Sequence, residues 1–160
     1  MRSTSKINAG LAVFSLLLSG GMAQASTVTT NLAVSATVNA VCVVNSVGAI
    51  SFGAYTGIAV TSSAAVNYTC SNGLPVSISL DKGANGATTA ARLMKNSTST
   101  LGYQLYSDFG YSTVWDDSAS KISVTGTGSA ATHTIYGQVP AGQYPAIGSY
   151  TDTVTVTFTY

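Results

Sequence analysis

Apolar and polar side chains alternate along the last part of the chain, GSYTDTVTVTFTY. Apolar residues stand at even positions, namely Val154, Val156, Phe158 and Tyr160, and the odd positions between them are threonines. Successive side chains of a β-strand point to opposite faces, so this pattern predicts a strand over about residues 149–160 with one apolar face. The pattern runs to the last residue without a turn, which indicates a strand that needs a neighbour.

A second, longer alternation lies near the other end, from Thr27 to Cys42, where the even positions are mostly apolar. At about 3.3 Å per residue this run would span roughly 53 Å, whereas strands are typically about 17–20 Å long. We therefore expect the half that ends at Cys42 to belong to the folded domain. The first half is then a spare strand, and its inward-facing side chains are expected to be Val28, Thr30, Leu32 and Val34.

Shorter strand patterns, separated by Gly, Asn and Ser, fill the middle of the chain. The pair 64–70 and 75–81 is expected to form a hairpin across Asn72-Gly73, a dipeptide typical of tight turns. Residues 82–99 are expected to be a loop-rich insertion with one helical turn near 90–95. Short strands at this spacing predict an all-β sandwich or barrel. The expected strands of the middle region are 49–55, 64–70, 75–81, 101–108, 121–126 and 133–140.

The first 25 residues have the three parts of a secretory signal. Arg2 and Lys6 precede an apolar run at 11–18, and Ala23-Gln24-Ala25 is a small-x-small cleavage site. The apolar run is too short to span a bilayer as a helix. We therefore expect residues 1–25 to be removed, residues 26–35 to be an N-terminal extension and residues 36–160 to be a single exported domain.

The low charge of the chain argues against binding to nucleic acid or to an anionic membrane, and its two cysteines predict a disulfide. Charged residues are 7% of the chain, far below the usual value of roughly one quarter. This leaves no basic patch for nucleic acid or for an anionic membrane. Cys42 and Cys70 are the two cysteines, and an even count in an exported protein predicts one disulfide.

No pattern predicts catalysis, a cofactor or a metal ion. His133 is the single histidine, and no Gly-x-Ser-x-Gly motif surrounds a serine. Asp108, Asp116 and Asp117 do not form a calcium-loop motif, and we interpret them as solvated loop acids. We therefore expect no catalytic, cofactor or metal site, and no enzyme.

The order of several short motifs resembles the spore coat protein U domain family, which includes archaic chaperone–usher pilus subunits. No single motif is specific, but their order and the cysteine placement are. One departure is Asp116, which stands where a Gly is expected after Trp115. The motifs are VSATVNAVC, SFGAY, YTC, ISLDKG, RLM, LGYQLYSD, TVW, IYGQVPAGQ and GSYTDTVTVTFTY.

The resemblance implies an incomplete immunoglobulin-like β-sandwich that lacks one strand and is completed by donor-strand exchange. It implies a periplasmic chaperone, an outer-membrane usher and identical or related subunits as partners, in an open head-to-tail polymer. The subunit would pass through the periplasm to a surface pilus used in adhesion and biofilm formation. In this scheme the residues that line the acceptor groove and contact the chaperone are Val154, Val156, Phe158 and Tyr160.

Two alternatives stay open at this point. A small outer-membrane β-barrel also alternates along its strands, and many such chains end on an aromatic residue, as this one does at Tyr160. Most strand patterns here are shorter than the roughly 9–11 residues that such strands need. The second alternative is a structural protein of a spore or cell coat rather than of a pilus, because the surface structure served by this family can differ.

Overall fold

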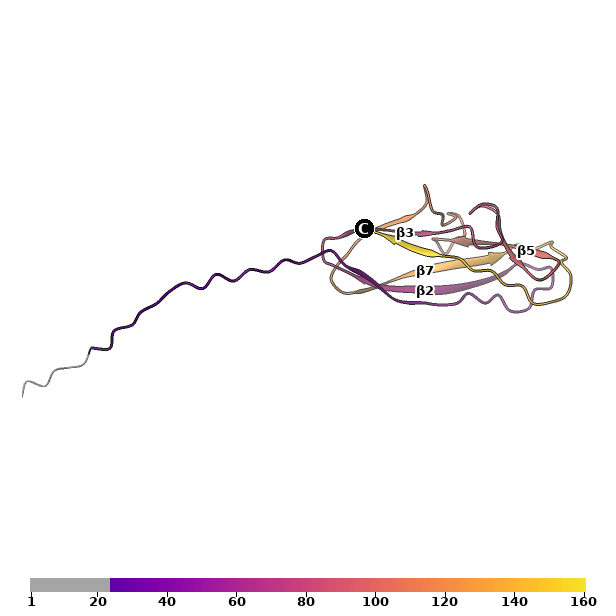
Figure 1. Ribbon diagram of the computed structural model, residues 1–160. Helices are drawn as coiled ribbons and strands as arrows, with labels where there is room; N and C mark the ends of the chain where they lie inside the picture. Colours follow the sequence, from indigo (N-terminus) through magenta and orange to yellow (C-terminus); the bar gives the residue numbers. More distant parts are fainter. Residues whose placement is uncertain (1–23) are drawn as a thin grey trace, which may run out of the picture. The chain divides into compact units, whose positions relative to one another are not determined.

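The computed structural model describes residues 24–160, and all but the end of the expected signal segment lies outside this part of the chain (Figure 1). The chain divides into two units, Met1–Ala36 and Thr37–Tyr160. In the first unit, residues 24–36 form neither helix nor strand and their side chains are exposed. Among the described residues there is no helix, and so no helical segment suited to crossing a membrane.

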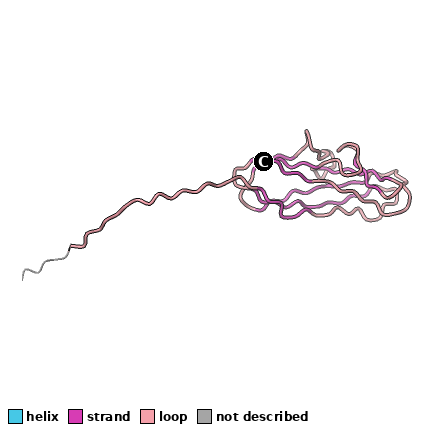
Figure 2. The backbone as a smooth tube through the Cα atoms, viewed as in Figure 1, coloured by secondary structure: helices cyan, strands magenta, loops and turns pink. Residues whose placement is uncertain are grey.

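The second unit is all-β, as the sequence predicts, with strands joined by loops (Figure 2). Its strands form two antiparallel sheets. The five-stranded sheet has the order β1-β2-β7-β5-β4, and the three-stranded sheet has the order β6-β3-β8. β1 and β8 are therefore edge strands, each with one hydrogen-bonded neighbour. The strands are β1 (Cys42–Val47), β2 (Val60–Cys70), β3 (Pro75–Leu80), β4 (Arg92–Lys95), β5 (Thr100–Tyr106), β6 (Ile122–Thr125), β7 (Ala130–Val139) and β8 (Val156–Thr159).

The alternating apolar residues of β2, β3, β5 and β7 form the core between the two sheets. Val66, Ile78 and Leu80 are fully buried, and so is Trp115 from the loop between β5 and β6. The Trp115 indole Nε1 donates a hydrogen bond of 3.0 Å to the carbonyl of Ile78, which satisfies its one polar atom inside the core. Asp116, which stands where the family motif led us to expect a Gly, holds the next turn by accepting from the N–H groups of Ser118 (3.0 Å) and Ser120 (2.7 Å).

The expected hairpin between β2 and β3 is wrong. β2 pairs with β1 and β7, whereas β3 pairs with β6 and β8, so both edges of each strand are occupied by other partners. The Asn72-Gly73 turn instead carries the chain from one sheet to the other. Gly73 has φ +78°, a conformation that glycine adopts at little cost, and its N–H donates to the carbonyl of Gly126.

Two further local predictions are wrong. Residues 49–55 form no strand: Ile50 and Phe52 pack against the core, but no neighbouring strand pairs with their backbone. Residues 92–95 are β4 rather than a helical turn, because pairing with β5 overrides the helical propensity of this short stretch.

The two ends of the domain are also less regular than expected. β1 begins only at Cys42, since its partner β2 ends at Cys70, directly opposite. At the other end, the regular part of the expected strand 149–160 is Val156–Thr159, where β3 provides the pairing partner. The residues just before Val156 form hydrogen bonds to β4 and to the loop after β3 instead.

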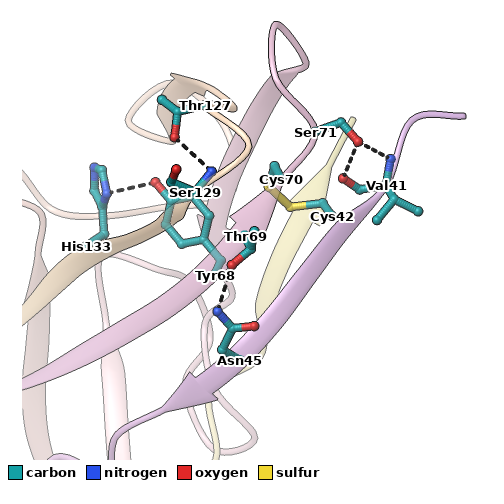
Figure 3. Close-up of a disulfide and its surroundings, with 10 residues drawn as sticks. All are labelled: Val41, Cys42, Asn45, Tyr68, Thr69, Cys70, Ser71, Thr127, Ser129 and His133. Carbon is teal, nitrogen blue, oxygen red and sulfur yellow. Dashed lines mark hydrogen bonds between the residues drawn. A yellow bond between two sulfur atoms is a disulfide. The ribbon is translucent and has the colours of Figure 1, made fainter. Parts of the chain in front are cut away.

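The predicted disulfide is confirmed and joins Cys42 to Cys70 (Figure 3). These cysteines form the first register pair of β1 and β2, with their Cα atoms 4.0 Å apart. Next to the bridge, the Ser71 hydroxyl accepts a hydrogen bond of 3.1 Å from the Val41 N–H and donates one of 3.2 Å to the Val41 carbonyl. The start of β1 is thus held by a covalent bond and by hydrogen bonds.

Candidate functional site

An apolar groove opens at the edge of the sandwich, with a volume of about 280 Å³; we call it the edge groove. One wall is the end of β1 and the segment after it, residues 47–52. The opposite wall is residues 150–156, which lead into β8. The floor is formed by core side chains of both sheets, namely Leu80, Met94, Tyr103, Leu105 and Ile135.

The wall that leads into β8 carries part of the apolar face predicted from the sequence. Val154 and Val156 line the edge groove, and the threonines between and beside them are exposed. Phe158 lies one step further and packs on the ring of Tyr68, with the ring centroids 5.2 Å apart. Tyr160 follows the end of β8, is 57% exposed and is not among the groove-lining residues.

The opposite wall was not identified as part of a site from the sequence. Ile50 and Phe52 turn toward the core from a segment without strand pairing, and Phe52 approaches Tyr103 with a centroid distance of 6.2 Å. Gly137 in β7 leaves room for both, because a Cβ at that position would meet Phe52 at 2.9 Å and Ile50 at 3.2 Å. The alternation of AISFGAY was the available signal, but it indicated a paired strand.

A second cavity, of about 660 Å³, adjoins the edge groove and shares Ile50, Phe52, Met94 and Tyr150 with it. Its walls are the loops 50–57 and 143–150. Gln143 fixes one of these loops to β5, since its side chain both accepts from the Gly102 N–H (2.7 Å) and donates to the Gly102 carbonyl (2.9 Å). The opening therefore continues beyond the edge groove, into a cavity with a more polar lining.

Carboxylates hold the wall that leads into β8. Asp152 accepts hydrogen bonds from the Ala84 N–H (3.0 Å) and the Tyr103 hydroxyl (2.6 Å), and Asp81 accepts one from the Thr155 N–H (2.9 Å). Burial and the bond to Asp152 raise the pKa of Tyr103 far above its ordinary value, so the phenol remains a donor.

Burial acts to raise the pKa of Asp81, but other effects outweigh it. The hydrogen bonds from Thr155 and Gly83, and the charge of Arg92, lower the pKa of Asp81 below its ordinary value of 3.8. Both bonds favour the ionised form. Asp81 is therefore an ionised acceptor at neutral pH.

The expected donor residues lie in the first unit and have no strand structure. Val28, Leu32 and Val34 are 93%, 86% and 86% exposed, and Thr30 is exposed as well. A regular row of large apolar side chains exposed to water is unusual for a protein surface that binds no partner. Their role as donor residues stays a prediction.

The residues weighed for catalysis or metal binding have other neighbours. The His133 Nδ1 lies 3.3 Å from the Tyr68 hydroxyl, and the nearby Ser129 N–H donates to the Thr127 hydroxyl (Figure 3). Asp108 accepts from the backbone of Ser112 and Thr113, which fixes a loop. Within residues 24–160 no three His, Cys, Asp or Glu residues gather in a way that could hold a metal ion.

Fold and groove together define a β-sandwich domain with an open apolar edge. The chain belongs to the Spore Coat Protein U domain family, whose family model matches residues 28–157. Protein U of Myxococcus xanthus is 34% identical over an alignment of 157 positions, which covers 86% of this chain and 88% of that protein. The family resemblance found in the sequence motifs is thereby confirmed.

A solved structure shares the fold. A chain in the CsuC-CsuE chaperone-tip adhesion subunit pre-assembly complex, from archaic chaperone-usher Csu pili of Acinetobacter baumannii, matches with a TM-score of 0.59 and 22% identity. The match covers 78% of this chain and 40% of that chain, so this protein spans less than half of it. A chaperone-tip adhesin complex of CFA/I fimbriae biogenesis matches with a TM-score of 0.39 and 14% identity, and adds nothing to the fold assignment.

Proposed function

We propose that this protein is a structural subunit of a surface fibre that a chaperone–usher pathway assembles by donor-strand complementation. The observation that carries the proposal is the edge groove, an apolar opening between residues 47–52 and 150–156 beside two edge strands. An apolar floor between two edge strands is the environment that one additional β-strand would need. In this view the domain is an incomplete immunoglobulin-like sandwich.

The exposed N-terminal segment has the chemistry of such a strand. Placing Val28, Leu32 and Val34 in the groove of another subunit would remove three large apolar side chains from water. Each should contribute about 1.5–3 kcal/mol, before any backbone hydrogen bonds to the free edge of β8 are counted. Because donor and acceptor are different surfaces of one chain, the assembly is head-to-tail and open, and it grows into a fibre.

The open groove also explains the expected partners. A free strand edge above an apolar floor favours aggregation, so the subunit needs a chaperone until a donor strand arrives. The matched Csu complex, which pairs an adhesion subunit with its chaperone, supports this partner. We therefore place the protein in the periplasm during transit and at the cell surface afterwards, with an outer-membrane usher, in a fibre that serves adhesion and biofilm formation without enzyme activity.

The test replaces one face of the N-terminal segment. A triple variant, Val28→Ser, Leu32→Ser and Val34→Ser, removes the apolar face, and the matched control changes the opposite face with Thr29→Ser, Asn31→Ser and Ala33→Ser. Both are expressed with the chaperone and usher, and fibres are counted by electron microscopy. We expect the first variant to accumulate as a chaperone-bound subunit and the control to form fibres; long fibres of the first variant would contradict the donor assignment.

A coat is the second candidate for the assembled structure, and the Spore Coat Protein U domain match favours it. The groove chemistry is the same in both cases, because either structure can be built from subunits joined by strand addition. Immunogold labelling of intact cells separates the two: label along thin fibres supports a pilus, and an even layer of label supports a coat.

A further inference from the structure

The wall residues 151–155 are bound to the domain in an unusual way. β8 pairs with β3 only from Val156 onward. Before it, Thr151 exchanges two backbone hydrogen bonds with Lys95 of β4, at 2.9 and 3.1 Å, so this short segment passes from one sheet to the other. The Thr153 carbonyl accepts a further bond of 3.0 Å from the Ala84 N–H, so backbone bonds to different partners hold single points of this wall and no regular ladder runs along it.

The Asp152 carboxylate bridges the gap. One oxygen, Oδ1, accepts from the N–H of Ala84 (3.0 Å), the N–H of Asn85 (3.2 Å) and the Asn85 side-chain amide (2.9 Å). The other oxygen, Oδ2, accepts from the Tyr103 hydroxyl (2.6 Å). A carboxylate that accepts several N–H groups from one loop is a strong, charge-assisted anchor.

Gly83 makes this arrangement possible. It has φ +77°, and a Cβ at this position would collide with the Asp152 carboxylate. Any other residue would therefore strain the backbone and displace the carboxylate as well. The loop 83–85 is shaped around the carboxylate of a residue some seventy positions later in the chain, as the Ala84–Asp152 separation of 68 shows.

Asp81 provides a second anchor on the same wall. Its Oδ1 accepts from the Thr155 N–H and from the Gly83 N–H, both at 2.9 Å, while its own N–H donates to the Thr155 carbonyl at 3.1 Å. Arg92 donates to the Asp81 carbonyl at 2.9 Å and so holds this loop from the core side. We call Asp81, Asp152 and the loop 83–85 the carboxylate clasp.

We propose that Asp152 and Asp81 are positioning residues of the edge groove: the carboxylate clasp holds residues 151–155 at the distance from residues 47–52 that an incoming strand requires. This rests on the proposed function. Val154 lies between the two anchors and faces the groove, so movement of this wall changes the groove directly. Without the clasp, a wall held only by separate backbone hydrogen bonds at Thr151, Thr153 and Thr155 can settle onto the floor and close the site.

The test measures wall mobility and strand binding separately. All variants are made in the full chain carrying Val28→Ser, Leu32→Ser and Val34→Ser, so that its own segment does not fill the groove. Hydrogen exchange of the amides at 151–155 reports on the wall. Fluorescence anisotropy of a labelled synthetic peptide of residues 26–35 reports on binding. The variants are Asp152→Ala, Asp152→Asn, Tyr103→Phe and the exposed-carboxylate control Asp117→Ala.

We expect Asp152→Ala to speed exchange at 151–155 and to weaken peptide binding at least about tenfold, while Asp117→Ala changes neither. Asp152→Asn keeps the acceptor oxygen for Ala84 and Asn85, and should restore both readouts. Tyr103→Phe removes a single hydrogen bond and should give an intermediate result; it decides the question if Asp152→Ala does not fold.

Three results would overturn the proposal. Unchanged exchange at 151–155 in Asp152→Ala, or in Tyr103→Phe if the former does not fold, would show that the clasp does not hold the wall. Faster exchange with unchanged peptide binding would show that the held wall does not matter for the groove. If the parent chain binds no peptide, the groove role of the clasp falls with the donor assignment, while the exchange data still decide whether the clasp holds the wall.

Discussion

Arg92 is a buried cation whose partners are all neutral oxygens. It is 1% exposed, and its guanidinium binds the backbone of β3 and of neighbouring loops together with one side chain of β5. Burial lowers the pKa of Arg92, yet an arginine stays charged in this setting. The Arg92 side chain therefore links several elements of the domain through hydrogen bonds inside the core. The acceptors are the carbonyls of Asp81 (2.9 Å), Thr89 (3.1 Å), Leu80 (3.2 Å) and Trp115 (2.8 Å), and Gln104 Oε1 (2.6 Å).

Arg92→Met should lower the free energy of unfolding by about 3 kcal/mol or more, because several buried acceptors lose their donor. Lys95→Met is the matched control, as it lies on the same strand β4 but is exposed; it should change stability by less than about 0.5 kcal/mol. Urea denaturation measures both. Equal losses in the two variants would contradict the role of Arg92.

His133 should make the free energy of unfolding depend on pH below about 6.5. Burial lowers its pKa below 6.5, and a hydrogen bond from the imidazole to the Thr132 backbone offsets only part of this. The unfolded chain then binds a proton more readily than the folded one, so stability should fall as pH decreases from 6.5 toward the lowered pKa. His133→Gln should flatten the stability profile between about pH 5 and 7, measured by urea denaturation. Identical slopes in the two proteins would refute this.

At the scale of elements, the sequence predicted strands better than it predicted their partners. The alternation around Val66, Ile78 and Leu105 located β2, β3 and β5, because period-two burial is a local property. Pairing depends on the whole sandwich, so the Asn72-Gly73 turn suggested a hairpin that the second sheet prevents. A strong turn signal predicts that the chain bends at that point. It does not predict that the two strands on either side of the turn pair with each other.

One wall of the edge groove could be predicted from the sequence, and the other parts of the groove could not. The apolar face of Val154 and Val156 follows from alternation, and the structure places both in the edge groove. The opposite wall and the carboxylate clasp join residues far apart in the sequence, such as Asp152 and Tyr103. The alternation puts Asp152 on the same face as Val154 and Val156, but a local pattern does not reveal the loop and the phenol that bind its carboxylate.

The face of β8 can be tested with two neighbouring positions. Val156→Asp places a carboxylate in the apolar groove, where an unpaired charge is strongly unfavourable. Thr157→Asp points to solvent from the same strand and should cost less than about 0.5 kcal/mol. We expect Val156→Asp to abolish chaperone capture and fibres, and Thr157→Asp to spare them, in co-purification and electron microscopy.

Thr155, the other neighbour of Val156, is not suitable as the control position. The Thr155 N–H binds Asp81, so an aspartate at 155 would add a like charge beside that carboxylate. Loss of fibres in both Val156→Asp and Thr157→Asp would mean that β8 does not present this face to the chaperone or the donor strand.

At the scale of the whole molecule, one chain carries both an exposed apolar segment and a groove that could accept such a segment. A subunit that both donates and accepts can repeat along a fibre, so we expect a shaft component present in many copies. Quantitative mass spectrometry of purified fibres, with labelled peptides of each subunit as standards, gives the copy number. A single copy per fibre would refute the shaft role.

The position of the disulfide has a mechanical consequence for such a fibre. Tension on a fibre joined through its N-terminal segments would enter each domain at the start of β1. An antiparallel edge strand pulled from its end peels away one hydrogen-bonded pair at a time, beginning with the first pair. Here the first pair is Cys42 and Cys70, so the force passes through a covalent bond into β2, which lies between two strands. The oxidised subunit should therefore resist forced extension that the reduced one would not withstand.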